Sequence, residues 1–424
     1  MKKIFTLSVV YFCFTGLIYC EHPRILSWQE VFTEAMGKNP ALKKAEESVK
    51  TARFNYLKSF SSFLPQVNAN ASANKSGSDT TGDSNNYSYG VSGTLSLFSG
   101  LKDLSTVKMK DLDLNSAEAD YKRTLSDTVY DLKKSFIELL WSQETVVLSE
   151  EILKQRNDNL QLVSLKYEAG NEDKGSLSRV QADKLQSEYD MAKAKRHTES
   201  AVFDLLRAIG NSEYEVLAVT GSFSITANYG DFADSIEHFF NDSYKEVPEY
   251  LKAENNLKKA KLEKTYSMGD FYPDLSLSAG DSRSGSRWAP QNDGWNVGIR
   301  LTYPLFNGGE RYFNLKTSAS NQIIAEEALR QTKYELFSNY KTALNSFYDA
   351  YENIKVSEKY LEASQEQSRV TTAKYINGLA TYQEWYAVEN DFINAKKNLL
   401  NARKNSVITE ATLRNIAGLT EGQQ

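Results

Sequence analysis

Cysteine, histidine and proline are scarce in this chain of 424 residues, which has 2, 3 and 7 of them. Both cysteines, Cys13 and Cys20, lie within the first twenty residues, so the remainder has no disulfide, thiolate nucleophile or cysteine metal site. No metal-ligand spacing, glycine-rich phosphate loop or nucleophile elbow occurs. These absences predict a protein that is not an enzyme and that holds no metal or cofactor.

An excess of basic charge is also missing. The chain has 50 lysines and arginines against 55 aspartates and glutamates, a formal net charge of −5. An acidic chain without a basic tract is poorly suited to hold a phosphate backbone, so nucleic-acid binding is set aside.

Long apolar runs are confined to the amino terminus. Lys2 and Lys3 precede an apolar stretch at 4–20, a pattern typical of a secretory signal peptide. A membrane-anchoring helix needs about 20 apolar residues, and this stretch has fewer. No later stretch is long enough to cross a bilayer as a helix, so an exported chain that enters a membrane must do so as strands.

In two parts of the chain, proline, glycine and phenylalanine residues recur at a spacing of 208 residues. The matching pairs are Pro40 and Pro248, Pro65 and Pro273, Phe98 and Phe306, Gly100 and Gly308, Gly170 and Gly378, and Gly210 and Gly418. Proline and glycine fix backbone geometry, so their recurrence predicts an internal two-fold repeat. The predicted divisions are a signal peptide at 1–20, a first repeat at 21–210, an equatorial linker at 211–247, a second repeat at 248–418 and a short tail at 419–424.

Each repeat contains two predicted strands, which lie near 66–98 in the first repeat and near 274–306 in the second. Polar, glycine-containing loops are expected to join each pair of strands, at 75–86 and 281–293. Apolar residues there alternate with small polar ones, as in a strand with one apolar and one wet face. Soluble hairpins are one interpretation, but with an export signal the pattern favours a transmembrane barrel wall. Four strands cannot close a barrel, for which eight is the practical minimum, so several copies must share one wall.

Each repeat also contains a long helix. After Gly100 the chain reaches Lys166 without proline or glycine, and apolar residues recur every seven positions. Those positions are Leu125, Leu132, Leu139, Val146, Leu153 and Leu160, with Tyr340, Phe347, Ile354 and Leu361 in the second repeat. A helix of some 65 residues is about 100 Å long. Gly170 and Gly378 are predicted to cap these helices, and a second helix returns from each turn.

Several short motifs occur in order along this doubled unit. They are Asn39-Pro40-Ala41-Leu42, Phe63-Leu64-Pro65-Gln66, Leu97-Phe98-Ser99-Gly100, Phe271-Tyr272-Pro273-Asp274, Pro304-Leu305-Phe306-Asn307-Gly308-Gly309, and Lys374-Tyr375-Ile376-Asn377-Gly378 with Tyr382. On these motifs, residues 27–418 resemble the TolC-like outer membrane factor family, the exit ducts of bacterial efflux pumps and type I secretion systems. The resemblance implies an α+β membrane protein in the outer membrane that extends into the periplasm.

The same resemblance implies an assembly. Three protomers, each with four strands, would form a 12-stranded transmembrane β-barrel continuous with a periplasmic α-barrel of coiled-coil hairpins. The implied partners are outer membrane lipid, a periplasmic adaptor (membrane fusion protein) and an inner-membrane RND or ABC transporter.

Site residues follow from the matched motifs. Barrel–helix corners are expected at Pro65, Gly100, Pro273 and Gly308, and adaptor docking at Gly170, Lys374, Gly378 and Tyr382. For the periplasmic aperture, Glu384 matches the first position of the family's acidic ring. Tyr375 matches a tyrosine that links neighbouring hairpins, and its acidic partner would fall at Ser176. Glu384 as a solvated helix carboxylate, and Tyr375 as a packing residue, remain open alternatives.

Cys20 follows Leu17-Ile18-Tyr19, which loosely resembles a lipoprotein cleavage site. The residue before such a cysteine is normally small, whereas here it is tyrosine. A tail of about seven residues from Cys20 to a helix near Ser27 reaches at most roughly 25 Å. The helix from Pro40 to Pro65, which lies between that point and the first strand, is already longer than about 35 Å. The tail would therefore fall short of the lipid. Ordinary signal cleavage after Cys20 is therefore preferred to lipidation.

The leading functional prediction is a passive exit duct that its partners open. The alternative is a non-conducting periplasmic coiled-coil scaffold whose strands only mediate assembly. Cargo, whether drug, metal or polypeptide, is chosen by the pump and adaptor, so the sequence predicts none.

Overall fold

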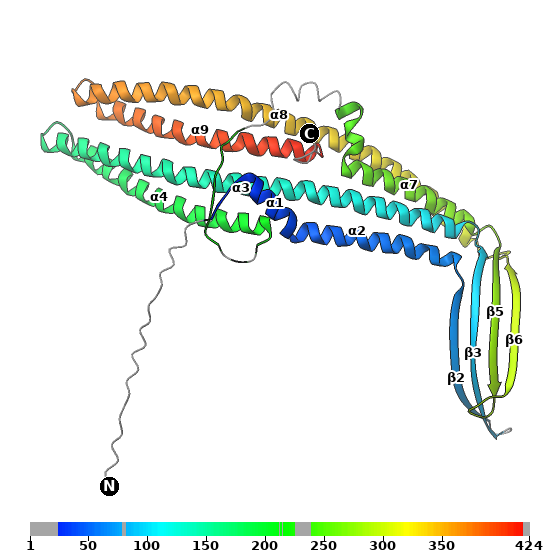
Figure 1. Ribbon diagram of the computed structural model, residues 1–424. Helices are drawn as coiled ribbons and strands as arrows, with labels where there is room; N and C mark the ends of the chain where they lie inside the picture. The colour runs from blue at the N-terminus through cyan, green and yellow to red at the C-terminus, as the bar shows by residue number, and fades with distance from the viewer. Residues whose placement is uncertain (1–23, 79–81, 212, 214, 225–238, 419–424) are drawn as a thin grey trace, which may run out of the picture.

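The computed structural model describes residues 24–78, 82–211, 213, 215–224 and 239–418. A bundle of long helices forms a rod, and a four-stranded sheet extends from one end of it (Figure 1). The first long elements are α2 (Pro40–Ser59), β2 (Gln66–Ser78), β3 (Gly82–Phe98), α3 (Lys102–Glu168) and α4 (Lys174–Ile209). The same order follows in α7 (Pro248–Gly269), β5 (Asp274–Gly285), β6 (Asn292–Thr302), α8 (Glu310–Ile376) and α9 (Tyr382–Ile416). Shorter elements are β1 (Arg24–Leu26), α1 (Trp28–Lys38), η1 (Phe60–Phe63), β4 (Leu217–Val219) and η2 (Ser243–Glu246).

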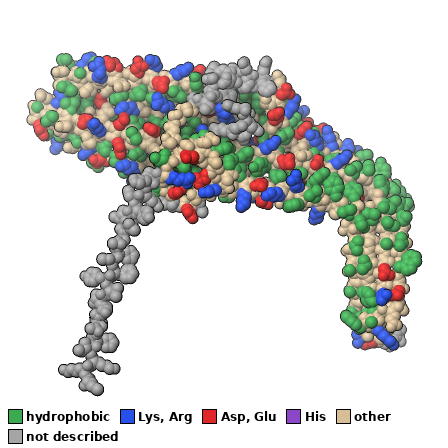
Figure 2. Space-filling model, viewed as in Figure 1, with side chains coloured by type: hydrophobic (Ala, Val, Ile, Leu, Met, Phe, Trp, Pro, Cys, Tyr) green, Lys and Arg blue, Asp and Glu red, His purple; other side chains and the backbone are tan. Residues whose placement is uncertain are grey.

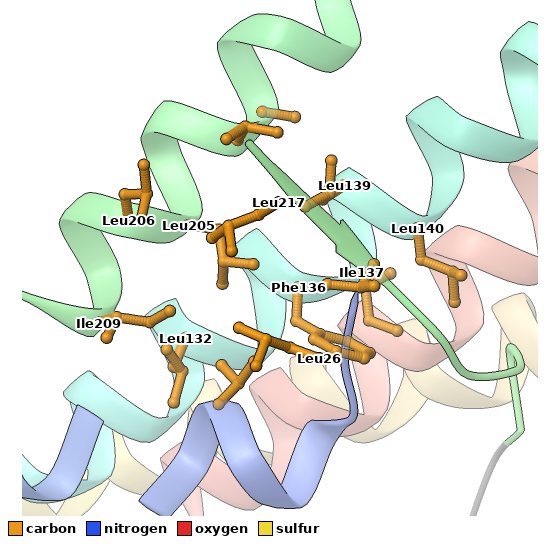
Figure 3. Close-up of a cluster of buried hydrophobic side chains, with 14 of the residues drawn as sticks. Leu26, Leu132, Phe136, Ile137, Leu139, Leu140, Leu205, Leu206, Ile209 and Leu217 are labelled. Atoms are coloured by element: carbon orange, nitrogen blue, oxygen red, sulfur yellow. The ribbon is translucent and has the colours of Figure 1, made fainter. Parts of the chain in front are cut away.

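The two longest helices, α3 and α8, have 67 residues each, which confirms the predicted length of about 100 Å. Their apolar stripes pack against the returning helices α4 and α9, and α3 also packs along α7 and α9. Leu132, Phe136 and Leu139 of α3 are almost fully buried. They form one cluster with Leu205 and Ile209 of α4 (Figure 3). This cluster joins the first hairpin to the short elements at the middle of the rod.

The sheet has the strand order β2-β3-β5-β6 and is antiparallel throughout. Its register places apolar residues of neighbouring strands on one face, for example Leu95 opposite Leu277 and Leu277 opposite Ile299. On the other face, the hydroxyl oxygens of Ser72 and Ser88 lie 2.8 Å apart. The predicted alternation is confirmed, and the apolar face is exposed (Figure 2).

The turns between paired strands are shorter than the sequence indicates. Polar loops were expected at 75–86 and 281–293, but the ladder extends into both segments. Lys75 and Asp83 pair across β2 and β3 at 2.7 Å, and Arg283 and Asp293 pair across β5 and β6 at 2.6 Å. Each of these oppositely charged pairs joins neighbouring strands within the polar segment that continues the ladder.

The rod and the sheet meet at two corners. Pro65 and Pro273 each stand directly before a strand, at the starts of β2 and β5. Gly100 and Gly308 leave the strands with φ of 65° and 68°, a left-handed conformation that favours glycine. A Cβ on Gly100 would lie 2.4 Å from the carbonyl oxygen of Gly269, whereas Gly308 faces open space. The first corner is therefore also a close approach of two backbones.

Short elements hold the middle of the rod. β1 pairs in parallel with β4, a contact the sequence did not predict. Gln143 of α3 both donates to and accepts from the backbone of Val219 in β4, at 3.2 and 3.0 Å. Further along the segment between the two halves, Phe239 stacks on Tyr340 of α8 at 3.9 Å.

Some predictions concern segments outside the described residues. They are the signal peptide at 1–20, Cys20 with its possible lipid, and the tail at 419–424. Within the described part of the chain, none of the helices has the length and apolarity needed to traverse a membrane.

Candidate functional site at the hairpin tips

Both long hairpins turn at a glycine in the left-handed conformation. Gly170 and Gly378 each have φ of 73°. The next amides, of Asn171 and Leu379, donate to the carbonyl oxygens of Lys166 and Lys374, both at 2.8 Å. This is the hydrogen-bond pattern of a glycine helix cap, so the predicted caps are confirmed. No other atom lies within 4 Å of a Cβ at either glycine, so glycine is needed there for its φ alone.

The returning helices begin with side-chain caps. The Asp173 carboxylate accepts from the Ser176 amide at 2.9 Å and starts α4. Thr381 and Glu384 form a capping box at the start of α9, with the Thr381 amide donating to the Glu384 carboxylate at 2.9 Å. That amide holds the pKa of Glu384 below its usual value. Glu384 is fully exposed, and its charge is oriented toward its own helix start.

A hydrophobic core joins the two tips of one protomer. Tyr375 and Trp385 of the second hairpin stack with ring centroids 4.7 Å apart and are 2% and 1% exposed. Val163 and Val180 of the first hairpin complete the buried cluster. The two tips therefore form one packed unit.

A polar contact crosses the same core. The Tyr375 hydroxyl donates to the Glu172 carboxylate at 2.6 Å. Burial, and then this hydrogen bond, raise the pKa of Tyr375 far above its usual value, so the phenol stays protonated. Lys166 lies over the Tyr375 ring at 4.8 Å and donates to the Ile376 carbonyl oxygen at 3.3 Å. Tyr375 therefore packs and also links the two hairpins.

Glu172 is a residue that the sequence did not single out. The family pattern placed the acidic partner of Tyr375 at Ser176, but the Ser176 hydroxyl instead donates to Asp173 at 3.1 Å. Glu172 and Tyr375 are 203 positions apart, and only the folded tips bring them together. A charged residue within a turn carries no sequence signal for such a contact.

Tyr382 lies against the same core, near Tyr386. Its hydroxyl is buried without a hydrogen-bond partner among the described residues. Burial, together with the nearby Tyr386 and Asp183, raises the pKa of Tyr382 to about 12. Lys374, predicted beside it as a docking residue, is exposed.

These pKa shifts predict that the tips weaken in alkali. A separated tip would lose the Tyr382 proton near the usual pKa of about 10, whereas the packed tip retains it up to about 12. Stability is therefore full below about pH 10 and falls as the pH rises through about 12. Hydrogen exchange of tip peptides across this range measures the loss. In Tyr382→Phe the Tyr382 contribution should disappear, and a profile unchanged from the wild type would contradict the assignment.

A second polar cluster lies one helical turn above the tip core. Glu389 of α9 is 3% exposed. Its carboxylate accepts from Gln155 at 2.6 Å, from Asn159 at 3.4 Å, from Thr372 at 3.2 Å and from Ser368. The sequence prediction missed it, although Glu389 stands four residues from both Trp385 and Ile393, on the buried stripe of its helix. One carboxylate thus ties α3, α8 and α9 together.

Replacement of Glu389 by glutamine tests this link. The amide has the same size but only one accepting oxygen, so buried donors of the neighbouring helices lose their partner. We expect a cost of about 1–3 kcal/mol in local opening free energy, measured by hydrogen exchange of peptides around 155–159 and 368–372. Glu366→Gln is the matched control, because Glu366 is exposed and, among the residues that the structure describes, forms an ion pair only with Arg369 of its own helix. Equal effects of the two variants would remove Glu389 from the link.

The helical rod, the four-stranded sheet and the two tips can be compared with known proteins. The model of the outer membrane efflux protein family matches residues 31–211 and 243–419, which is most of the chain. The chain belongs to this family. The resemblance seen in the sequence is thereby confirmed.

Individual relatives agree with the family assignment. The chain is 20% identical over 412 residues to the outer membrane protein TolC of Vibrio cholerae, covering 93% of this chain and 91% of the relative. It is 21% identical over 394 residues to the cation efflux system protein CusC of Escherichia coli K12, covering 90% and 84%. The crystal structure of VceC from Vibrio cholerae matches the fold with a TM-score of 0.79 and 18% identity, covering 92% and 95%.

Family membership gives the location and the general activity. The protein lies in the outer membrane, extends into the periplasm and serves efflux transport. The family consists of channel proteins and not of enzymes.

Proposed function

We propose that this protein is the passive outer-membrane duct of a tripartite efflux system, built from three copies of the chain. The observation that carries the proposal is the sheet, whose exposed apolar face and two open edges stand at one end of a rod of 67-residue helices. An open sheet of four strands cannot enclose water, so identical copies must complete the wall. Its hydroxyl-rich face then lines the pore.

The exposed aromatic residues support a membrane position for the sheet. Trp288 and Trp295 are 82% and 81% exposed near one end, and Phe306 is 85% exposed at the other. Aromatic girdles at both interfaces are typical of outer-membrane barrels. The two girdles would bracket the exposed Val297, Ile299 and Leu301 of β6.

Energy for transport must then come from partners. We assign these roles to a periplasmic adaptor and an inner-membrane RND or ABC transporter, with the adaptor meeting the tips at Gly170 and Gly378. The duplication of the helix–strand–strand–helix–helix unit would give each protomer two related hairpin tips. The cargo could belong to any of three classes: drugs, metals or polypeptides.

Conductance in a planar lipid bilayer distinguishes a duct from a scaffold. The detergent-purified chain should migrate as a heat-modifiable trimer and should conduct ions when inserted. A water-soluble rod that does not conduct would instead support the coiled-coil scaffold.

The role of Glu384 is tested in the same bilayer. We propose that three Glu384 carboxylates face the axis of the closed aperture, where they would attract divalent cations. Glu384→Gln removes the charge but keeps a side chain that can complete the capping box. Block by divalent cations should therefore weaken in Glu384→Gln as much as in Glu384→Ala. Unchanged block in both would leave Glu384 with its capping role only.

A further inference from the structure

A recess of about 290 Å³ lies between α3, α4 and α9, away from both the tips and the sheet. Its apolar lining includes Trp141, Leu148 and Ile152 of α3 and Leu400 of α9. Lys193 and other polar side chains of α4 and α9 surround this lining. An apolar recess with a few polar groups at its rim is the usual form of a small-molecule site.

The recess and the short elements at mid-rod lie on different faces of α3. Gln143 of α3 bonds to β4, and Phe136 lies against Gly221, so these residues face the short elements at mid-rod. Trp141 and Leu148 lie roughly 120–160° away from them around the same helix, at 3.6 residues per turn. In a conducting duct the short elements must lie outside, because inside they would obstruct the passage. If the proposed function holds, the recess therefore faces the lumen.

The aromatic wall of the recess is held rigidly. The Trp141 indole nitrogen donates to Asn401 at 3.1 Å. The His197 ring meets it edge-on at 5.6 Å, and the Lys404 ammonium lies 3.8 Å from the ring centroid. A ring fixed in this way offers an apolar surface without loss of side-chain freedom on binding.

The charges around the recess leave one cation unmatched. Lys404 pairs with Glu138 at 3.3 Å, and Lys397 faces Asp190 at 3.9 Å. Lys193 has no ion-pair partner within the described ranges. The site therefore combines a fixed aromatic surface with a single available ammonium group.

We propose that this recess is a transit site for small amphipathic anions with a planar aromatic body. The body would lie against Trp141, Leu148 and Ile152, and the anionic group would meet Lys193. Three such sites per trimer would hold cargo of this class briefly within the lumen. A pore needs sites of this kind to be weak, so that cargo enters and also leaves.

The test uses naphthalene-2-sulfonate as a blocker of the conducting protein in a planar bilayer. Two matched probes separate its features: methanesulfonate has the charge without the ring, and 2-naphthyltrimethylammonium has the ring with the opposite charge. We expect block by naphthalene-2-sulfonate alone, and a loss of its apparent affinity of about tenfold in Lys193→Glu. Lys195→Glu is the control, because Lys195 is an exposed lysine of the same helix that instead faces Glu150.

Two results would overturn the proposal: equal block by the cationic probe, or block that Lys193→Glu leaves unchanged. A protein that does not conduct overturns the proposed function instead. In that case calorimetric titration of naphthalene-2-sulfonate into the purified protein measures whether the recess binds it. Weaker binding in Lys193→Glu than in Lys195→Glu supports the site, and equal binding in the two variants excludes it.

Discussion

Replacing Trp385 by alanine is expected to separate the two hairpin tips of each protomer. The indole is 1% exposed, stacks on Tyr375 and donates to the Thr372 hydroxyl at 3.0 Å. Removing a buried aromatic side chain of this size costs about 3–5 kcal/mol, because its contacts are lost and a cavity remains.

Hydrogen exchange of peptides at 160–180 and 370–390 measures the effect, with the mid-rod cluster around Leu132 and Leu205 as an internal reference. Exchange should rise sharply at both tips and stay unchanged at mid-rod, since the two buried clusters have no residue in common. Tyr360→Ala on α8 is the control, because that ring is 70% exposed. If only the second tip became labile, the joined core would not be one unit. In a conducting trimer the same variant should raise the resting conductance.

Gly100→Ala is expected to disturb the junction between rod and sheet, and Gly308→Ala to disturb it far less. Both glycines have nearly the same positive φ, so alanine costs about 1–2 kcal/mol at either position. At Gly100 the added Cβ also meets the backbone oxygen of Gly269 at 2.4 Å, and relieving that clash costs about 1–3 kcal/mol more. The difference between the two variants isolates the close approach.

Thermal unfolding of the detergent-purified protein, followed by circular dichroism in the strand region, compares the two glycine variants. Gly100→Ala should lower the midpoint clearly more than Gly308→Ala, and it should reduce the yield of heat-modifiable oligomer. Equal midpoints would mean that α7 and the start of α3 can move apart without cost.

The positions of proline and glycine made much of this fold predictable. Long stretches without either residue predicted the extent of α3 and α8, and Gly170 and Gly378 marked their ends. The alternation of apolar and polar residues predicted the two faces of the sheet, because successive side chains of a strand point to opposite faces. These signals are local, because each depends only on residues that are close together in the chain.

Contacts between distant segments were not predictable in the same way. β1 has three residues, too few for a recognisable alternation, and it forms only because β4 lies beside it. Glu172 reaches Tyr375 through the relative placement of two hairpins that no local pattern records. Glu389 was the exception that could have been found, because a carboxylate within an apolar stripe needs buried donors nearby.

The pairing of β1 with β4 fixes the level of Arg24 along the rod. Arg24 lies beside Leu217 at mid-rod, and α2 alone, about 30 Å of helix, separates that level from the sheet. A fluorophore attached to a cysteine in the variant Arg24→Cys would project sideways into the periplasm, because the Arg24 side chain is exposed. It would report on proteins that gather around the middle of the rod, away from the sheet and from the tips.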